Sequence, residues 1–198
     1  MNLDRIEVKQ KTGNEPLTFS QKETGKKLID FWKWSVSDIL SNATRGRFAE
    51  FIVATALDID PTNVRDEWSS YDLINSEGIK IEVKSASYLQ SWYQNKLSEI
   101  CFDIKKTRKW DEKTGKYSDT PSREADVYVF CLLNHEDKKT VEPLNLDQWK
   151  FFVLSTSEID NYKRSQSSIT LNSLKKLTKE ISFDLLRDAI IEQYEHSK

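Results

Sequence analysis

The sequence predicts an α/β (α+β) protein with a central β-sheet flanked by helices. Apolar residues recur at helical spacing near the N-terminus, at Leu28, Phe31, Trp32 and Ile39. The middle of the chain holds short segments rich in Ile, Val, Tyr, Phe and Trp, which favour strands. Helical spacing returns after Leu171. Helices at both ends of the chain would therefore cover a sheet formed by the middle segments.

The N-terminal part is predicted to begin with an arm and to continue as helices. Residues 1–19 are polar and include a glycine and a proline, which favours a flexible, loosely attached arm. After the first helix, a second is expected over residues 43–58, because Phe48, Ile52 and Ala56 recur every four residues and share one face.

Five strands are expected in the middle of the chain, at residues 68–74, 79–86, 99–104, 125–133 and 149–154. The run ADVYVFCLL is apolar almost without interruption, which predicts a strand buried on both faces. Residues 105–124 show no periodicity, and loops of that length are usually functional or disordered. Residues 155–198 are expected to form a helical C-terminal extension, because helical spacing returns near Leu171.

Length and composition fit one domain, residues 1–198, in the cytoplasm. A chain of 198 residues can bury one substantial core, and its length gives no reason to divide it. The net charge of −2 does not by itself indicate a nucleic-acid partner as a strongly basic balance would, so a local basic patch would have to bind one. Cys101 and Cys131 lack disulfide or zinc spacing and fit a reducing cytosol. We expect no membrane contact, because no apolar run approaches the length of a bilayer span.

The segment YDLINSEGIKIEVK is typical of a hairpin. A type I turn over NSEG that ends with Gly78 at positive φ gives a three-residue loop with a bulge. The register then pairs Asn75 with Ile79, Ile74 with Lys80, Leu73 with Ile81, Asp72 with Glu82 and Tyr71 with Val83.

This register separates apolar from charged residues. One face is predicted to collect Tyr71, Leu73, Ile79, Ile81 and Val83, and the other Ser70, Asp72, Glu82 and Lys84. Two acids on adjacent strands can hold a hard divalent cation such as Mg²⁺, which keeps waters and phosphate oxygens among its ligands. Such an ion polarises a phosphate and activates water. A lysine on the same face can orient that water or stabilise the developing charge.

Asp72, followed ten residues later by Glu82-Val83-Lys84, resembles the signature of the PD-(D/E)XK nucleases, the restriction-endonuclease-like superfamily. The sequence departs from the motif name at Tyr71, which stands in place of the proline. The chain has six (D/E)-x-K matches, and only Glu82/Lys84 lies on an expected strand whose hairpin partner carries an acid in register. The resemblance covers residues 43–154, as an αβββαβ core with a mixed sheet.

The resemblance implies a Mg²⁺- or Mn²⁺-dependent endonuclease that hydrolyses the DNA backbone, duplex or branched, in restriction or repair. Asp72, Glu82 and the Val83 carbonyl would bind the metal, Glu50 on the second helix would be a further ligand, and Lys84 would activate water. Family members also place polar residues after the lysine against the metal or the DNA backbone, here Ser85, Ser87 and Gln90.

Residues 105–116, called the basic loop below, offer a separate contact to nucleic acid. Its phosphate contacts would come from Lys105, Lys106, Arg108 and Lys109. A solvated mobile loop is the alternative interpretation of the same residues.

The catalytic residues have alternatives too. Asp72, Glu82 and Lys84 could form a solvated strand face with an ordinary salt bridge, and Glu50 could be a surface residue paired with Arg47 or Arg45. The same fold could also serve as a metal-free nucleic-acid-binding or adaptor module. A nuclease that works only with a methyltransferase or helicase partner is a further alternative, and two copies of the chain could pair as a homodimer.

Overall fold

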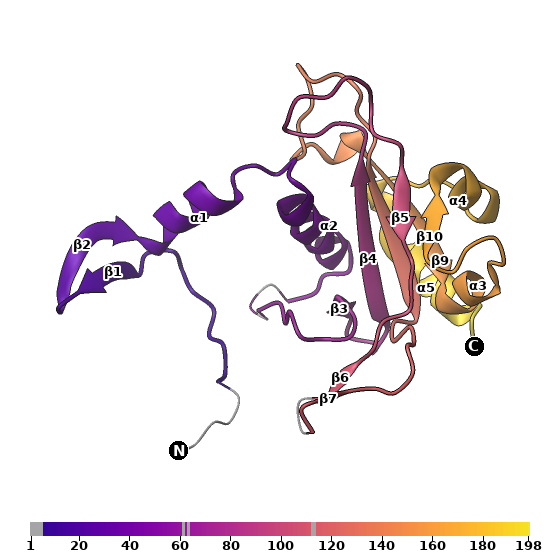
Figure 1. Ribbon diagram of the computed structural model, residues 1–198, viewed down its shortest axis with the longest axis horizontal. Helices are drawn as coiled ribbons and strands as arrows, with labels where there is room; N and C mark the ends of the chain where they lie inside the picture. The colour runs from indigo at the N-terminus through magenta and orange to yellow at the C-terminus, as the bar shows by residue number, and fades with distance from the viewer. Residues whose placement is uncertain (1–5, 61, 63, 112–113) are drawn as a thin grey trace.

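The computed structural model describes residues 6–60, 62, 64–111 and 114–198. Its centre is a mixed four-stranded sheet with the strand order β3-β4-β8-β9 (Figure 1). Strands β4 and β8 are parallel and the outer pairs are antiparallel, so the predicted mixed sheet flanked by helices is confirmed. The four strands are β3 (Leu73–Ile74), β4 (Lys80–Ser87), β8 (Val127–Leu133) and β9 (Trp149–Ser155).

Helices α2 (Asn42–Ala56) and α5 (Leu186–Glu195) cover one face of this sheet. The odd-numbered residues of β8 point to this face, where they pack with Ala49, Ile52 and Val53 of α2. The helix therefore places its apolar stripe on the sheet, as the spacing of Phe48, Ile52 and Ala56 predicts.

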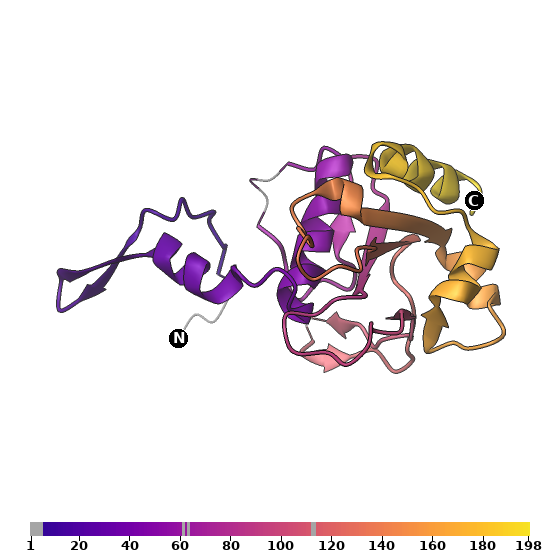
Figure 2. The same ribbon diagram turned by 90° about the horizontal axis from the view of Figure 1, so that it is seen from above.

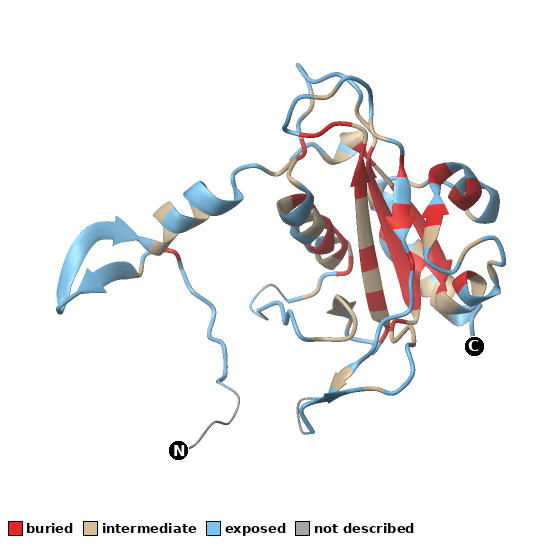
Figure 3. Cartoon of the chain, viewed as in Figure 1, coloured by how far each residue is buried: buried red, intermediate tan, exposed pale blue. Residues whose placement is uncertain are grey.

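The opposite face packs against a second layer. Even-numbered residues of β8 and β9 contact Phe102, Ile159, Ile169 and Leu174. All seven residues of β8 are buried, which confirms the strand predicted to be covered on both sides (Figure 3). The second layer consists of β5 (Cys101–Asp103), α3 (Thr156–Asn161), β10 (Ser168–Thr170) and α4 (Leu171–Leu177).

Three expectations about the elements are wrong in detail. The strand expected at 68–74 is reduced to Leu73–Ile74. Beyond Leu73 the Val83 N–H of β4 donates to the side chain of Asp72, so the backbone ladder does not continue. Residues 105–124 contain a hairpin, β6 (Trp110–Asp111) and β7 (Lys116–Tyr117), held by the packed rings of Trp110 and Tyr117. The αβββαβ core that the resemblance implies has a helix before its last strand, whereas the structure has the short 3₁₀ helix η1 (Leu146–Gln148) before β9.

The N-terminal elements stand apart from the sheet (Figures 1 and 2). They are the hairpin β1 (Pro16–Phe19) and β2 (Lys22–Lys27), followed by α1 (Leu28–Val36), and none of their residues is buried. The predicted arm of residues 1–19 thus includes a strand, and its first five residues lie outside the described part. The flexibility of the arm stays a prediction.

The C-terminal extension is helical as predicted, with α3, α4, the 3₁₀ helix η2 (Phe183–Leu185) and α5, interrupted by the short strand β10. Strand β10 pairs with β5 in a separate two-stranded sheet. Within the described ranges, no helix has the length and apolar character needed to cross a membrane.

Candidate active site

The hairpin β3-β4 has the predicted register. Leu73 pairs with Ile81 and Ile74 with Lys80, and Gly78 closes the turn at φ +82°. Along β4, Ile81 is buried among the residues under α2, whereas the next side chain in the strand is partly exposed on the other face. The separation of apolar and charged side chains on β4 is therefore confirmed.

Tyr71 does not join the apolar face on which the sequence placed it. Its ring packs against the second core, the buried cluster between the sheet and the second layer. The Lys80 ammonium lies 5.6 Å from the ring centroid. The regular strand ends at Leu73, so the alternation of faces no longer holds two residues further back.

Asp72 lies where the two strands of the hairpin separate. Its main-chain N–H donates to the Ile81 carbonyl at 3.0 Å, and its Oδ2 accepts the Val83 N–H at 2.7 Å. Its side chain is 20% exposed. Burial, and next the charge of Glu82, raise the pKa of the Asp72 carboxyl against the opposing effect of the Val83 N–H. The two acids thus interact although the ladder ends one residue earlier.

Glu82 and Lys84 share the face of β4 that points away from α2. The Lys84 ammonium donates to Glu82 Oε1 at 2.6 Å, and both side chains are mostly covered. The charge of Lys84 also reaches Asp72, where it favours the ionised carboxylate. The structure therefore brings the three predicted catalytic side chains Asp72, Glu82 and Lys84 into one electrostatic group.

Glu50 of α2 approaches Asp72 from the helix side. Its side chain is only 12% exposed, so it is not the surface residue of the alternative interpretation. Its partner is Arg65, which donates from Nε to Oε2 and from a terminal nitrogen to Oε1 at 3.1 Å, while Arg47 pairs with Glu67. Burial raises the pKa of the Glu50 carboxyl, and the negative charge of Asp72 raises it further. The hydrogen bonds and charge of Arg65 act in the opposite direction and lower this pKa. Glu50 thus lies next to the group of Asp72, Glu82 and Lys84, but its carboxylate is already paired with the guanidinium of Arg65.

Two hollows open on this group. One, of about 130 Å³, is bordered by Glu82, Lys84 and Lys105; the other, of about 200 Å³, by Asp72, Glu82, Arg108 and Lys109. Glu82 forms part of the wall of both. Trp68, Tyr71, Trp110 and Tyr117 border the second hollow, which therefore combines aromatic and basic side chains above the carboxylates.

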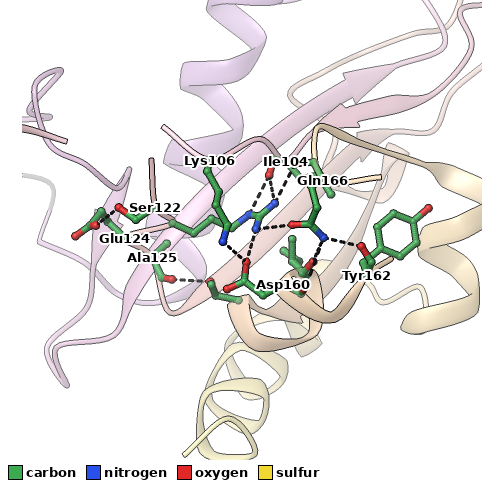
Figure 4. A network of polar contacts seen from close by, with 11 residues as sticks. Ile104, Lys106, Ser122, Glu124, Ala125, Asp160, Tyr162 and Gln166 are labelled. Carbon is green, nitrogen blue, oxygen red and sulfur yellow. Dashed lines mark hydrogen bonds and ion pairs between the residues drawn. The ribbon is translucent and has the colours of Figure 1, made fainter. Parts of the chain in front are cut away.

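The basic loop is fixed to the body of the protein at both ends. Arg123, whose side chain is 1% exposed, donates from Nε to the Ile104 carbonyl at 2.9 Å and from a terminal nitrogen to Gln166 at 3.0 Å. It also pairs with Asp160, which Lys106 approaches to 3.2 Å (Figure 4). The lysines of the loop thus start from an ordered base, and Lys106 itself is turned toward α3.

The polar residues Ser85, Ser87 and Gln90, which follow Lys84, form hydrogen bonds within the protein. Ser85 and Gln90 accept hydrogen bonds from the buried guanidinium of Arg45, at 3.2 and 3.3 Å, and Ser87 Oγ accepts the Leu89 N–H at 3.2 Å. Ser87 and Gln90 are buried and Ser85 is partly exposed. Their predicted contact with nucleic acid stays a prediction.

The donor set suits a hard cation that keeps ligands outside the protein. Among the residues described, no group of three or more His, Cys, Asp or Glu side chains is close enough to enclose a metal ion. Mg²⁺, however, is often held by one or two carboxylates together with water and substrate phosphate. Asp72 and Glu82, whose charges oppose each other, are a pair that a cation would stabilise. Two carboxylates, completed by water and substrate phosphate, are the ligand set that would hold Mg²⁺ here.

Arg65 and Arg123 were not among the residues predicted from the sequence. Arg65 lies fifteen residues beyond Glu50 and Arg123 nineteen beyond Ile104, each in a connecting segment without periodicity. No pattern of spacing indicates such long-range partners.

Comparison with known proteins gives the family. The model of the family described as bacteriophage T4 endonuclease IV matches residues 2–173. No curated protein matches the chain. Among solved structures, the bacterial homing endonuclease I-Ssp6803I is similar, with 22% identity, a TM-score of 0.39, and coverage of 79% of this chain and 95% of that one. Since the family model spans most of the sequence, the chain belongs to the bacteriophage T4 endonuclease IV family.

Proposed function

We propose that this protein is a metal-dependent DNA endonuclease of the PD-(D/E)XK type. The observation that carries the proposal is the group formed by Asp72, Glu82 and Lys84, in which two carboxylates interact and an ammonium lies 2.6 Å from one of them. Membership of an endonuclease family supports the same reaction. Around the second hollow, the basic side chains are of the kind that binds phosphates, and the aromatic side chains are of the kind that stacks on bases.

Each side chain has a separate task. Asp72 and Glu82, with the Val83 carbonyl, would hold Mg²⁺ or Mn²⁺, and Glu50 would be an outer ligand. The bound ion would polarise the scissile phosphate and lower the pKa of a water molecule. The Val83 N–H fixes the orientation of the Asp72 carboxylate, because it donates a hydrogen bond of 2.7 Å to Oδ2. Lys84, released from Glu82 when that carboxylate binds the ion, would hold the attacking water or the charge on the phosphate.

A cleavage assay with matched lysine variants tests this proposal. The purified protein is incubated with Mg²⁺ or Mn²⁺ on duplex, single-stranded, branched and modified DNA. Lys84→Ala should lower the cleavage rate roughly 100- to 1000-fold, as the loss of one positioned hydrogen-bond donor to a developing negative charge does in other enzymes. Lys80→Ala is the control, because Lys80 lies on the same strand over the Tyr71 ring. Intact cleavage by Lys84→Ala would refute the assignment.

A metal-free binding or adaptor module is the second candidate function. It is favoured by the charge balance of the site, in which Lys84 pairs with Glu82 and Arg65 with Glu50. Calorimetric titration with Mn²⁺ separates the two functions. A nuclease should give binding heat that Asp72→Ala removes, and a binding module should give none. A homodimer, or a methyltransferase or helicase partner, would be indicated by cleavage that appears only when that component is present.

A further inference from the structure

Arg65 is surrounded by acids. Its guanidinium binds both oxygens of Glu50 and lies 3.7 Å from Glu67 Oε1 and 3.9 Å from Asp72 Oδ1. These acids come from α2, from the connecting segment and from the hairpin, so Arg65 joins three parts of the chain. It therefore occupies the space between the outer ligand Glu50 and the metal ligand Asp72.

The contacts of Arg65 compete with those of a metal ion. The Glu50 carboxylate is nearly covered, and both of its oxygens already accept from the guanidinium. A divalent ion that used Glu50 would have to break these charge-assisted hydrogen bonds first. The positive charge of Arg65 also acts on Asp72, where it stabilises the carboxylate without a metal.

Arg65 has room to move away. Its side chain is 35% exposed, unlike the side chain of Glu50 that it binds. A hollow of about 930 Å³ borders Glu50, Arg65 and Asp72, and it also meets Arg47. The guanidinium can thus leave the two acids without passing through the packed core.

We propose that Arg65 is a resident cation, which a divalent metal ion has to displace from Glu50 and Asp72 and which then binds a phosphate oxygen of the DNA. The inference rests on the proposed nuclease function and deepens it. The planar guanidinium is suited to phosphate, because it donates two parallel hydrogen bonds to such an anion. Metal binding without DNA is then weak, and DNA favours loading because it offers Arg65 a new partner.

Mn²⁺ titration without DNA tests the resident cation directly. Arg65→Gln should bind Mn²⁺ about tenfold or more tightly than the wild type, since charge-assisted hydrogen bonds no longer oppose binding. Arg65→Lys keeps the charge but loses the two-pronged contact, and its affinity should lie between the two. Arg47→Gln is the control, because it also removes one positive charge. Arg47 lies on α2 and pairs with Glu67, and among the charged neighbours of Glu50 it has the smallest effect on the Glu50 pKa. Its affinity should equal that of the wild type.

The outcomes separate this inference from the proposed function. Mn²⁺ heat that depends on Asp72, with no gain in Arg65→Gln, overturns the resident cation and leaves the nuclease intact. Should Arg65→Gln fail to fold, a wild-type affinity in Arg65→Lys overturns it equally. The absence of Asp72-dependent heat from the wild type and every Arg65 variant, together with no cleavage, overturns both proposals.

The DNA contact has its own readout. In a Lys84→Ala background, which slows cleavage enough for binding to be measured, Arg65→Gln should weaken DNA binding more in Mn²⁺ than in EDTA, because only the displaced guanidinium reaches the phosphate. Equal weakening in the two conditions overturns the phosphate contact.

Discussion

Replacement of Asp72 by Asn should make the metal-free protein more stable. The native carboxylate is 80% covered at a point where burial and the charge of Glu82 both raise its pKa. Its folded form therefore prefers the proton, and the stability that this preference contributes at low pH is lost as pH rises through the folded pKa. At neutral pH the charge is thus a cost, which an amide does not carry.

The size of this effect follows from the contacts of Asp72. Asn keeps an oxygen for the Val83 N–H at 2.7 Å and loses only the distant attraction of Arg65 at 3.9 Å and that of Lys84. Relief of one cross-strand repulsion is worth about 0.2–1 kcal/mol, and the removal of a partly buried charge adds to it. A net gain of about 1 kcal/mol corresponds to a rise in Tm of about 2–4 °C for a chain of this length.

Mn²⁺ should reverse the order of stability. At a free concentration 100 times its Kd, a ligand stabilises the folded state by about 2.7 kcal/mol, which raises the Tm of the wild type by roughly 5–10 °C. Asp72→Asn lacks one of the two carboxylate ligands and should gain little. The variant is then the more stable protein in EDTA and the less stable one in Mn²⁺.

Thermal unfolding followed by circular dichroism, in EDTA and in Mn²⁺, measures both effects. Asp103→Asn is the control, because burial of Asp103 is outweighed by hydrogen bonds from Lys105, so that its pKa is lowered and its charge stabilises the fold. Asp103→Asn should not raise the Tm in either solution. The reasoning is refuted if Asp72→Asn lowers the Tm in EDTA, or if Mn²⁺ raises the Tm of wild type and variant equally.

The remaining predictions concern pH, DNA binding and the turn. Mn²⁺ affinity should fall on acidification at a pH above the usual range of an aspartate, since Asp72 must ionise and its pKa is raised; a calorimetric pH series in which affinity stays flat through that range contradicts this. Lys109→Ala, beside the second hollow, should weaken DNA binding for all sequences and reduce the salt slope by about 1, measured by fluorescence anisotropy; an unchanged slope would show that Lys109 contacts no phosphate. Gly78→Ala should cost about 1–2 kcal/mol in urea unfolding, because φ is +82° while an added Cβ meets no neighbour, and Gly78→Asn should cost less; equal costs would exclude the backbone explanation.

Much of the site could be predicted from local patterns. The turn NSEG and the alternation along IKIEVK fix which residues of the hairpin pair, since a slip of one residue would bury Glu82 and expose Ile81. The same alternation places Glu82 and Lys84 together. The strand Val127–Leu133 is equally determined, because a continuous apolar run is stable only with both faces covered.

Other features depend on partners far along the chain. Tyr71 faces the second core because the side chain of Asp72 replaces a strand bond and ends the alternation. Gln90 is buried because Arg45, forty-five residues earlier, needs acceptors inside the protein. Spacing along the sequence carries no information about such bonds.

The sequence by itself determined the hairpin, its register and the shared face of Glu82 and Lys84, because each depends on residues a few positions apart. Only the tertiary structure decided that Glu50 is buried and held by Arg65 beside Asp72. Charge acts through space and not along the chain, so the partner of a buried acid is known only when the helix, the loop and the hairpin have packed together.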